Sequence, residues 1–304
     1  MIETAQLLIE ESLQNQKTLY ATDRRESIYR LLDYYAGDNT VQYIEDRFNA
    51  NAFREVPVSE FNVTRRMIDR MSRIYTHGAT RNVNKEYDSM IAKKPYKLKH
   101  IEKMTRLIGT IATQVVFKQF PQPHFNYSPV YYFDAFFNSD PFHPSAITYP
   151  MTQNVHDISD VSKLQYCYWD ENQYMIYDQD GNVIFEQDHN YGVIPFLFTH
   201  REHNLNEFFV TGAHDICAAN ESINILLTEA SLGMRFQMFG QYVIEGMYEE
   251  EKLMRAGSSE IMVVPEGAKM DIKSPKANVR ECIDLVKAIL DLTAQNNHLW
   301  ITFA

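Results

Sequence analysis

Three polar side chains around a glycine have the chemistry to bind a cation. Asp178, Asp180 and Asn182 flank Gly181, and carboxylate and amide oxygens are the ligands that Ca²⁺ prefers. An EF-hand loop also needs a glutamate at its twelfth position, and the residue at that position, counted from Asp178, is His189. The segment therefore fails as a calcium loop, and its letters DQDG predict a polar turn between two β-strands.

Two histidines in the segment HREH have the chemistry to bind a transition metal. His200 and His203 stand three residues apart, whereas zinc sites on helices favour HExxH spacing with a third ligand. The sequence offers no obvious third ligand for this pair. We therefore expect ordinary surface or core histidines and no metal site.

Motifs of the common enzyme classes do not occur in this chain. It contains no GxGxxG, GxxxxGK[ST], GxSxG, HExxH or CxxC segment. We therefore predict that the protein is not an enzyme and uses no cofactor. Catalytic carboxylates can arise in a fold without any motif, so an intracellular α+β enzyme or regulatory domain with an acidic catalytic pair stays open as the alternative.

The composition predicts a folded chain that cannot grip nucleic acid by charge. Of its 304 residues 45% are hydrophobic, and the net charge is −11. This charge is opposite to what a protein needs to displace counterions from phosphates, so any contact with DNA must come from surrounding it. The sequence contains no run of about 18 apolar residues, the length that would predict a membrane helix. Cys167, Cys217 and Cys282 are odd in number and far apart, which predicts three buried thiols in a reducing compartment.

The first 118 residues are predicted to be helical. Apolar side chains at helical spacing indicate helices over residues 22–36 and 62–77, each closed by a glycine. A third helix is expected from Pro95 to about residue 118, because Pro121 and Pro123 exclude its continuation.

A basic stretch lies between and along these helices. A solvated helix face is the favoured interpretation, and a contact with DNA or with a neighbouring subunit is the alternative. The stretch comprises Lys93, Lys94, Lys97, Lys99, Lys103 and Arg106.

Between about residues 124 and 200 the apolar pattern changes to a period of two. Short aromatic and β-branched segments such as KLQYCYWD, QYMIYD and NVIFEQ are separated by turn residues. We expect an antiparallel sheet here, so the predicted fold class is α+β.

Two long helices are predicted after Thr211. Residues 212–239 contain no proline and carry one apolar stripe, so at about 1.5 Å per residue this helix is about 42 Å long. A second helix is expected from Ser274, as N-cap before a proline, to Asn296 and Asn297. The segments QYVIEG and EIMVVPEGAKMDI between them predict a small tip with short strands. We expect a hairpin rod that packs sideways against its neighbours.

This order of parts resembles the portal proteins, or head–tail connectors, of tailed double-stranded-DNA bacteriophages. NVTRRMIDRMSRIYTHG at 62–78 is similar to an early helix of that family, and YGVIPFLFTHRE at 191–202 is similar to the strand that precedes its stem. The stretch from His214 to Gly240 looks like the first stem helix, and EIMVVPEGAKMDIKSPKA looks like the exit from the clip domain. The resemblance covers most of the chain. It rests on the order of the parts and on the general character of their sequences, because the family has no short signature motif.

The resemblance implies a portal-like α+β architecture. The wing would span residues 1–210, the first stem helix 211–245, the clip 246–274 and the second stem helix 275–304. The tunnel loop and crown of the family, which follow the second stem helix, have no counterpart before Ala304.

The resemblance also implies a function. The chain would form a homo-oligomeric ring, a dodecamer, at one capsid vertex of a virion assembled in the host cytoplasm. Double-stranded DNA would pass through this channel without sequence specificity during genome packaging and ejection. Terminase, the major capsid protein and a head–tail adaptor would be its partners, without any membrane. Another virion adaptor subunit is the remaining alternative.

Acidic side chains on the stem and clip are the candidate functional residues. In a ring, each carboxylate that faces the bore is repeated in every subunit and repels phosphates over about 8 Å, so that DNA slides. Glu221 and Glu229 lie eight residues apart and are expected to share one helix face, although an ordinary solvated face is an equal alternative for each acid. The candidate channel lining is Asp215, Glu221, Glu229, Asn296 and Asn297, and the candidate clip docking surface is Glu249, Glu250, Glu251, Lys252 and Arg255.

Overall fold

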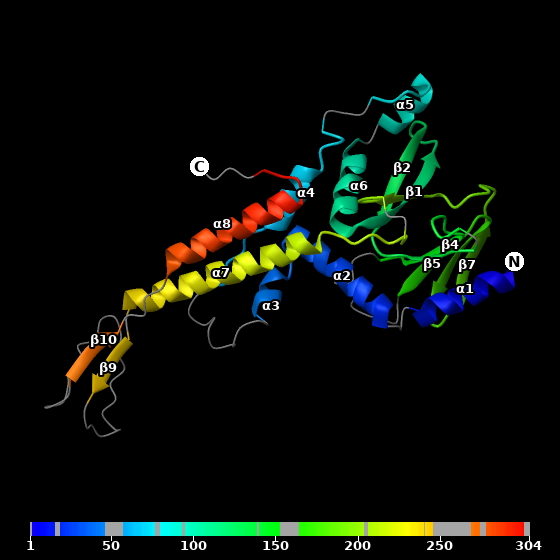
Figure 1. The fold of residues 1–304 in the computed structure, drawn as a ribbon. Coiled ribbons are helices and arrows are strands. Elements are labelled where there is room, and N and C mark those ends of the chain that lie inside the picture. Colours follow the sequence, from blue (N-terminus) through cyan, green and yellow to red (C-terminus); the bar gives the residue numbers. More distant parts are fainter. Residues whose placement is uncertain are drawn as a thin grey trace. The chain divides into compact units, whose positions relative to one another are not determined.

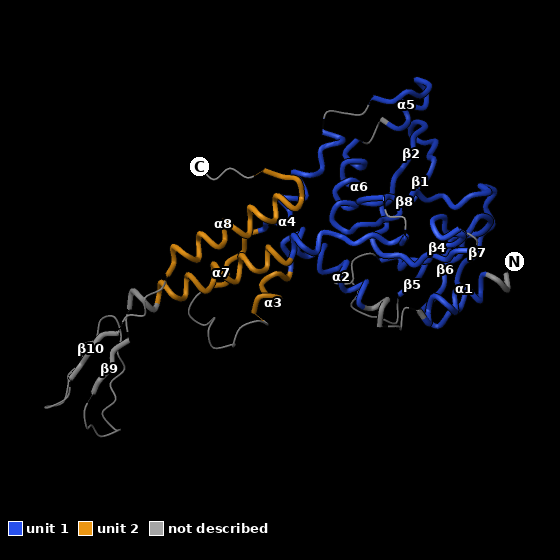
Figure 2. Tube along the Cα trace, in the orientation of Figure 1, with its two compact units in different colours: residues 1–38, 62–217 blue, residues 39–61, 218–304 orange. Residues whose placement is uncertain are grey.

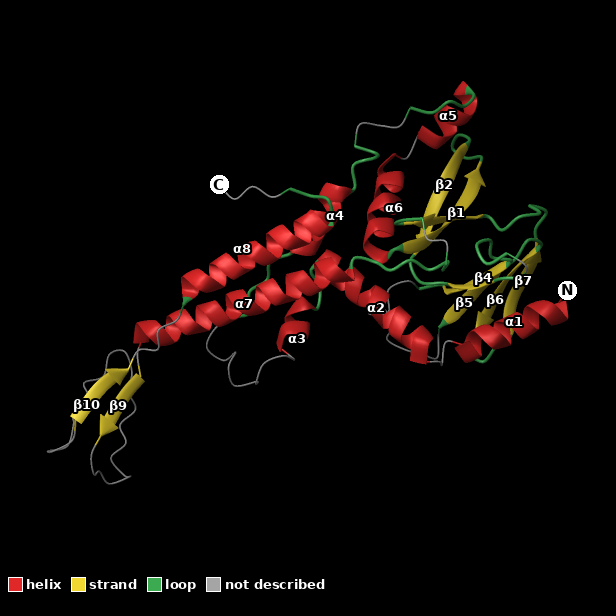
Figure 3. Ribbon diagram, in the orientation of Figure 1, coloured by secondary structure: helices red, strands yellow, loops and turns green. Residues whose placement is uncertain are grey.

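The protein folds into helices and antiparallel sheets, which confirms the predicted α+β class (Figure 3). The computed structural model describes residues 2–15, 19–45, 57–76, 80–92, 95–138, 140–152, 164–203, 206–239, 241–245, 269–273 and 278–300. Among these residues no helix is both long enough and apolar enough to cross a membrane.

Two compact units make up the chain (Figure 2). The first contains residues 1–38 and 62–217, and the second contains residues 39–61 and 218–304. The boundary falls inside helix α7 (His214–Phe239), a few residues after the predicted end of the wing at residue 210.

Five helices and two sheets of the first unit are described. The helices are α1 (Ile2–Asn15), α2 (Leu19–Ala36), α4 (Val63–Met71), α5 (Lys85–Ala92) and α6 (Pro95–Ile108). One sheet has the order β2-β1-β8, with β1 (Thr110–Lys118), β2 (His124–Val130) and β8 (Phe196–His200). The other has the order β3-β4-β5-β6-β7, with β3 (Asp134–Phe136), β4 (Ala146–Pro150), β5 (Gln165–Trp169), β6 (Gln173–Asp178) and β7 (Val183–Asp188).

Helix α2 ends where its sequence predicts, but α4 ends early. Gly37 has φ +89° and its N–H donates to Asp33 O at 2.7 Å, which closes α2. Helix α4 was expected to continue to residue 77 and stops at Met71. The reason is a competing acceptor, because the N–H groups of Ile74 and Tyr75 donate to the Glu102 carboxylate instead of to helix carbonyls.

Residues 110–118 form a strand, so the predicted helix from Pro95 to residue 118 is wrong in its last third. Helix α6 ends at Ile108, and Gly109 follows with φ +100°, a conformation that ends a helix. The next nine residues are rich in β-branched side chains and form the central strand β1, which pairs antiparallel with β2 and β8. Their apolar spacing fits both a helix and a buried strand, and the glycine decides between the two.

Aromatic side chains dominate the core of the first unit. Helix α1 covers one face of the five-stranded sheet through Ala5 and Ile9, which pack with Tyr168 and Tyr177 (Figure 1). A second cluster joins the two sheets and includes Ala112, Phe133, Ile147, Phe196 and Phe208. Tertiary packing therefore holds the two sheets in one compact unit.

The turn between β6 and β7 confirms the prediction from DQDG. The two strands pair antiparallel, and Gly181 takes φ +86°. The Asp178 carboxylate accepts hydrogen bonds from the backbone N–H groups of Asp180 and Asn182, both at 2.9 Å. The polar side chains that suggested a calcium loop thus stabilise the turn.

A partly exposed polar network ties three helices of the first unit together. Lys103 on α6 forms a 2.6 Å ion pair with Asp69 on α4, and Tyr35 on α2 donates to the same carboxylate at 2.8 Å. Burial alone would raise the pKa of Asp69, but the hydrogen bonds from Lys103 and Tyr35 outweigh burial and hold this pKa below its ordinary value.

The Asp69 network predicts a loss of stability in acid. Because the pKa of Asp69 is lowered on folding, its contribution is present above the ordinary carboxyl pKa of about 4 and is lost as the pH falls through the folded-state pKa. We expect Asp69→Asn to lower the unfolding midpoint at neutral pH and to flatten its decline below about pH 4. Asp284→Asn is the control, because Asp284 is exposed and 3.9 Å from Lys287. Equal acid slopes for wild type and Asp69→Asn would contradict this role.

The second unit contains a helical hairpin closed by a two-stranded ribbon (Figure 1). Strand β9 (Gln241–Glu245) directly follows α7, and strand β10 (Lys269–Lys273) precedes α8 (Val279–Asn296). The two strands pair antiparallel with Gln241 opposite Lys273, so the end of α7 and the start of α8 leave the ribbon side by side. Helix α7 has 26 residues and is about 39 Å long. The N-cap predicted at Ser274 lies outside the described residues, and α8 begins at Val279.

Polar side chains on α7 bind the segment before α4. Within the second unit, Asn224 accepts from Phe61 N–H at 2.8 Å and donates to Phe61 O at 3.2 Å, and Thr228 Oγ1 accepts from Ser59 N–H at 3.0 Å. Asn224 and Thr228 are buried. These bonds satisfy backbone groups of Ser59 and Phe61, which lie outside the helices and strands of the described chain. Helix α3 (Thr40–Glu45) is the remaining described element of the second unit.

Candidate functional site

The three acids predicted on the first stem helix lie at different depths. Asp215 in the first turn of α7 is exposed, and so is Glu229. Glu221 is only 8% exposed. Glu221 and Glu229 were predicted to share one helix face, but one is buried and the other exposed, because eight residues leave about 80° between two side chains on a helix. Glu229 remains the acid of this pair that is open to solvent.

The two asparagines at the end of α8 also differ. Asn296 is exposed. Asn297 is 7% exposed, its side chain donates to Thr293 O at 3.0 Å, and its N–H donates to Ala294 O at 3.1 Å. Asn297 therefore ends the helix, and Asn296 keeps the predicted role as a candidate for the channel.

The candidate clip docking surface cannot be placed. It lies outside the described residues and comprises Glu249, Glu250, Glu251, Lys252 and Arg255.

Helix α8 exposes large apolar side chains. Leu285 and Leu292 are 49% and 60% exposed and lie seven residues apart, so they share one face. Ile283 on the same helix is also exposed, to 42%. The buried stripe of α8 consists instead of Val286, Thr293 and Ala294. Cys282, expected to be buried, is partly exposed, whereas the other two cysteines are buried, and none of the three forms a disulfide within the described part of the chain.

Two lysines of the basic stretch make intramolecular contacts. Lys97 donates to Asn126 Oδ1 at 2.7 Å and to Tyr127 O at 3.1 Å, and Lys103 pairs with Asp69. The predicted solvated face is therefore wrong for these two side chains, which fasten α6 to β2 and α4. Lys93 and Lys94 lie outside the described residues.

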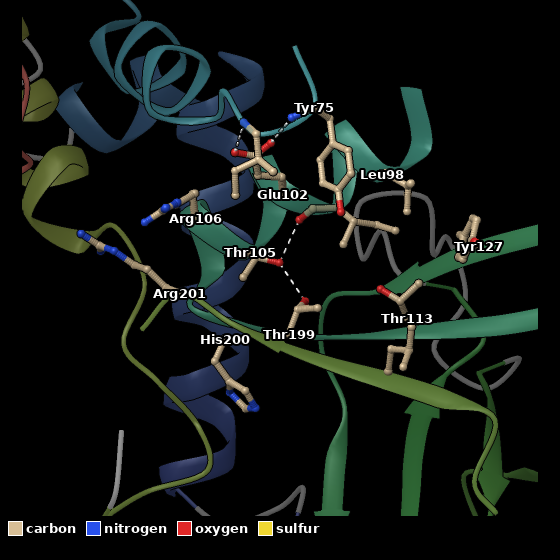
Figure 4. Close-up of a pocket in the computed structure, with 13 residues that line it drawn as sticks. Tyr75, Leu98, Glu102, Thr105, Arg106, Thr113, Tyr127, Thr199, His200 and Arg201 are labelled. Atoms are coloured by element: carbon tan, nitrogen blue, oxygen red, sulfur yellow. Dashed lines mark hydrogen bonds between the residues drawn. The ribbon is translucent and has the colours of Figure 1, made fainter. Parts of the chain in front are cut away.

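A pocket of about 280 Å³ lies between α6 and the three-stranded sheet (Figure 4). Its walls are apolar and aromatic, from Leu98 and Ile101 on α6, Tyr127 on β2 and Leu197 on β8. The loop after α4 completes the pocket with Tyr75. This volume is close to the lower limit of small-ligand pockets and suits one aromatic ring.

The pocket combines an unsatisfied hydroxyl with two guanidinium groups. Thr113 is 1% exposed, and its Oγ1 has no hydrogen-bond partner among the described residues. Arg106 and Arg201 lie on the opposite side of the pocket from Thr113 (Figure 4). Arg201 donates to Gly212 O at 3.0 Å. A buried hydroxyl without a partner costs free energy that an incoming hydrogen-bonding group would recover.

His200 at the pocket margin is an ordinary structural histidine. Its Nδ1 lies 3.0 Å from Thr110 Oγ1. Its ring packs edge-on against the Phe208 ring, with 5.1 Å between the two ring centroids. Burial lowers the pKa of His200, and the nearby His203 lowers it further. The described residues contain no group of three or more metal-ligating side chains.

Sequence reasoning missed this pocket because it misassigned β1. Thr113 was placed inside a helix, although the β-branched run that follows Gly109 was a usable signal. The remaining lining comes from α6 and β8, which are far apart in sequence, and no local pattern reports such a contact.

Comparison with protein-family models and with curated proteins finds no match to this chain.

Proposed function

We propose that this protein is the portal subunit of a tailed double-stranded-DNA bacteriophage. In this proposal the subunits form a ring, a dodecamer, at one capsid vertex, and DNA passes through the ring during packaging and ejection. The proposed location is the virion, and the proposed partners are terminase, the major capsid protein and a head–tail adaptor. The chain would act without catalytic residues or a cofactor.

The helical hairpin carries this proposal. A long helix, a two-stranded antiparallel ribbon and a second long helix follow one another in the second unit, after a first unit of helices and antiparallel sheets. This order is the one that the portal resemblance implies for stem, clip and stem.

Two surface features of the hairpin support self-association around DNA. The exposed Leu285 and Leu292 on α8 offer an apolar face that a neighbouring copy would bury. The exposed Glu229 on α7 offers a carboxylate that would repel phosphates if it faced the bore. The overall charge of −11 favours sliding DNA over bound DNA.

Native mass spectrometry of the full chain tests the proposal. A ring of about twelve copies of 35.6 kDa has a mass of about 430 kDa. We expect this species in the wild type and its loss in the double variant Leu285→Asp, Leu292→Asp, since charges on the apolar face cannot be buried without partners. Arg280→Asp, at another exposed position of the same helix, is the control and should still assemble. A wild type that remains monomeric or dimeric contradicts the proposal.

A further inference from the structure

An aromatic side chain with a hydroxyl group fits the α6–sheet pocket. Its volume of about 280 Å³ accommodates one ring, its walls are apolar, and the buried Thr113 Oγ1 lacks a partner among the described residues. Arg106 and Arg201 add two positive charges on the other side, against the single carboxylate of Glu102, whose oxygens already accept from the backbone N–H groups after α4. A tyrosine next to acidic residues therefore matches the pocket in shape, hydrogen bonding and charge.

One exposed tyrosine of the described chain meets these requirements. Tyr87, Tyr96 and Tyr191 are each more than half exposed. Tyr96 stands among lysines, and Tyr87 follows both a lysine and a glutamate. The segment from Asp178 to Tyr191 instead carries four acids and neither lysine nor arginine.

Tyr191 also stands beside an open strand edge. Strand β7 is at the end of the five-stranded sheet, and all six of its residues are exposed. Three of these are consecutive apolar side chains, Val183, Ile184 and Phe185, with exposures of 36%, 54% and 43%. An apolar edge strand of this kind is a template for association with another chain.

We propose that Tyr191 of one copy enters the α6–sheet pocket of the next copy. Its hydroxyl would bind Thr113 Oγ1, Asp188 would pair with Arg106, and Glu186 would pair with Arg201. Because the inserting surface and the receiving pocket are different parts of the same chain, the contact is head-to-tail and can close a ring. This inference rests on the proposed ring and adds to it a specific contact between the first units of neighbouring subunits.

Substitutions at the two ends of this contact test it on the full chain. The measurement is the protein concentration at which half of the subunits are assembled, read by mass photometry. Tyr191→Ala should raise this concentration at least about 30-fold, as expected for a buried aromatic anchor. Tyr191→Phe should raise it about 5-fold through loss of one hydrogen bond, and should have no further effect in a Thr113→Val background. Tyr96→Ala, which removes an equally exposed tyrosine, is the control and should assemble as the wild type does.

A charge exchange tests the rim of the pocket. Arg106→Glu should weaken assembly, and Asp188→Arg in the same chain should restore part of it, because each contact then carries the reversed pair. Rings that form normally in Tyr191→Ala overturn this inference and leave the proposed ring intact. A wild type that never assembles overturns both. Independent effects of Tyr191→Phe and Thr113→Val would overturn the hydroxyl contact.

Discussion

Gly109→Ala is expected to destabilise the first unit severely. A Cβ atom at Gly109 would lie 2.0 Å from Val210 O, and the backbone there has φ +100°. The chain crosses itself at this point, since a Cβ at Gly212 would likewise lie 2.5 Å from Leu107 O. Both contacts are with backbone carbonyls, so relief requires the chain itself to shift, and we expect a cost of about 3 kcal/mol or more.

The unfolding temperature is the measurement for this prediction. The expected change is a fall of roughly 6–12 °C, or failure to express as soluble protein. Gly192→Ala is the matched control, because Gly192 also has a positive φ, +65°, but a Cβ there meets nothing within 4 Å. Its expected cost is about 1 kcal/mol from backbone strain alone. Equal effects of the two substitutions would show that the close crossing contributes nothing.

Asn224→Ala is expected to release the segment that lies along α7. The variant removes both hydrogen bonds to Phe61, which is itself 59% exposed, so water can reach the released N–H and C=O groups. Each lost hydrogen bond contributes about 0.5–1.5 kcal/mol. We therefore expect the Phe61 amide to exchange its hydrogen at least about 30-fold faster than in the wild type.

Hydrogen exchange resolved at residues 57–62 measures this effect. Ser222→Ala is the control on the same helix, because Ser222 is exposed and its hydroxyl donates to Ala218 O. Unchanged exchange at Phe61 in Asn224→Ala would mean that the Asn224 side chain does not hold the segment.

Local signals in the sequence predicted much of the fold. The β6–β7 turn followed from one tetrapeptide, and the long helix α7 was expected within two residues of its observed start. Such features depend on neighbours in sequence, namely turn chemistry, the absence of proline and helical spacing.

Long-range contacts account for what the sequence left unpredicted. Helix α4 ends early because of Glu102, and Asn224 binds a residue 163 positions away. The strand β1 depended on one glycine whose close contact lies about 100 residues further on. The burial of Glu221 likewise depends on packing that helical spacing alone does not report.

Negative-stain electron microscopy of the purified full chain tests the central proposal most directly. The proposed ring predicts end-on views of closed rings with about twelve copies around an open hole. Compact particles of one or two subunits, or open filaments without a closed ring, would contradict it.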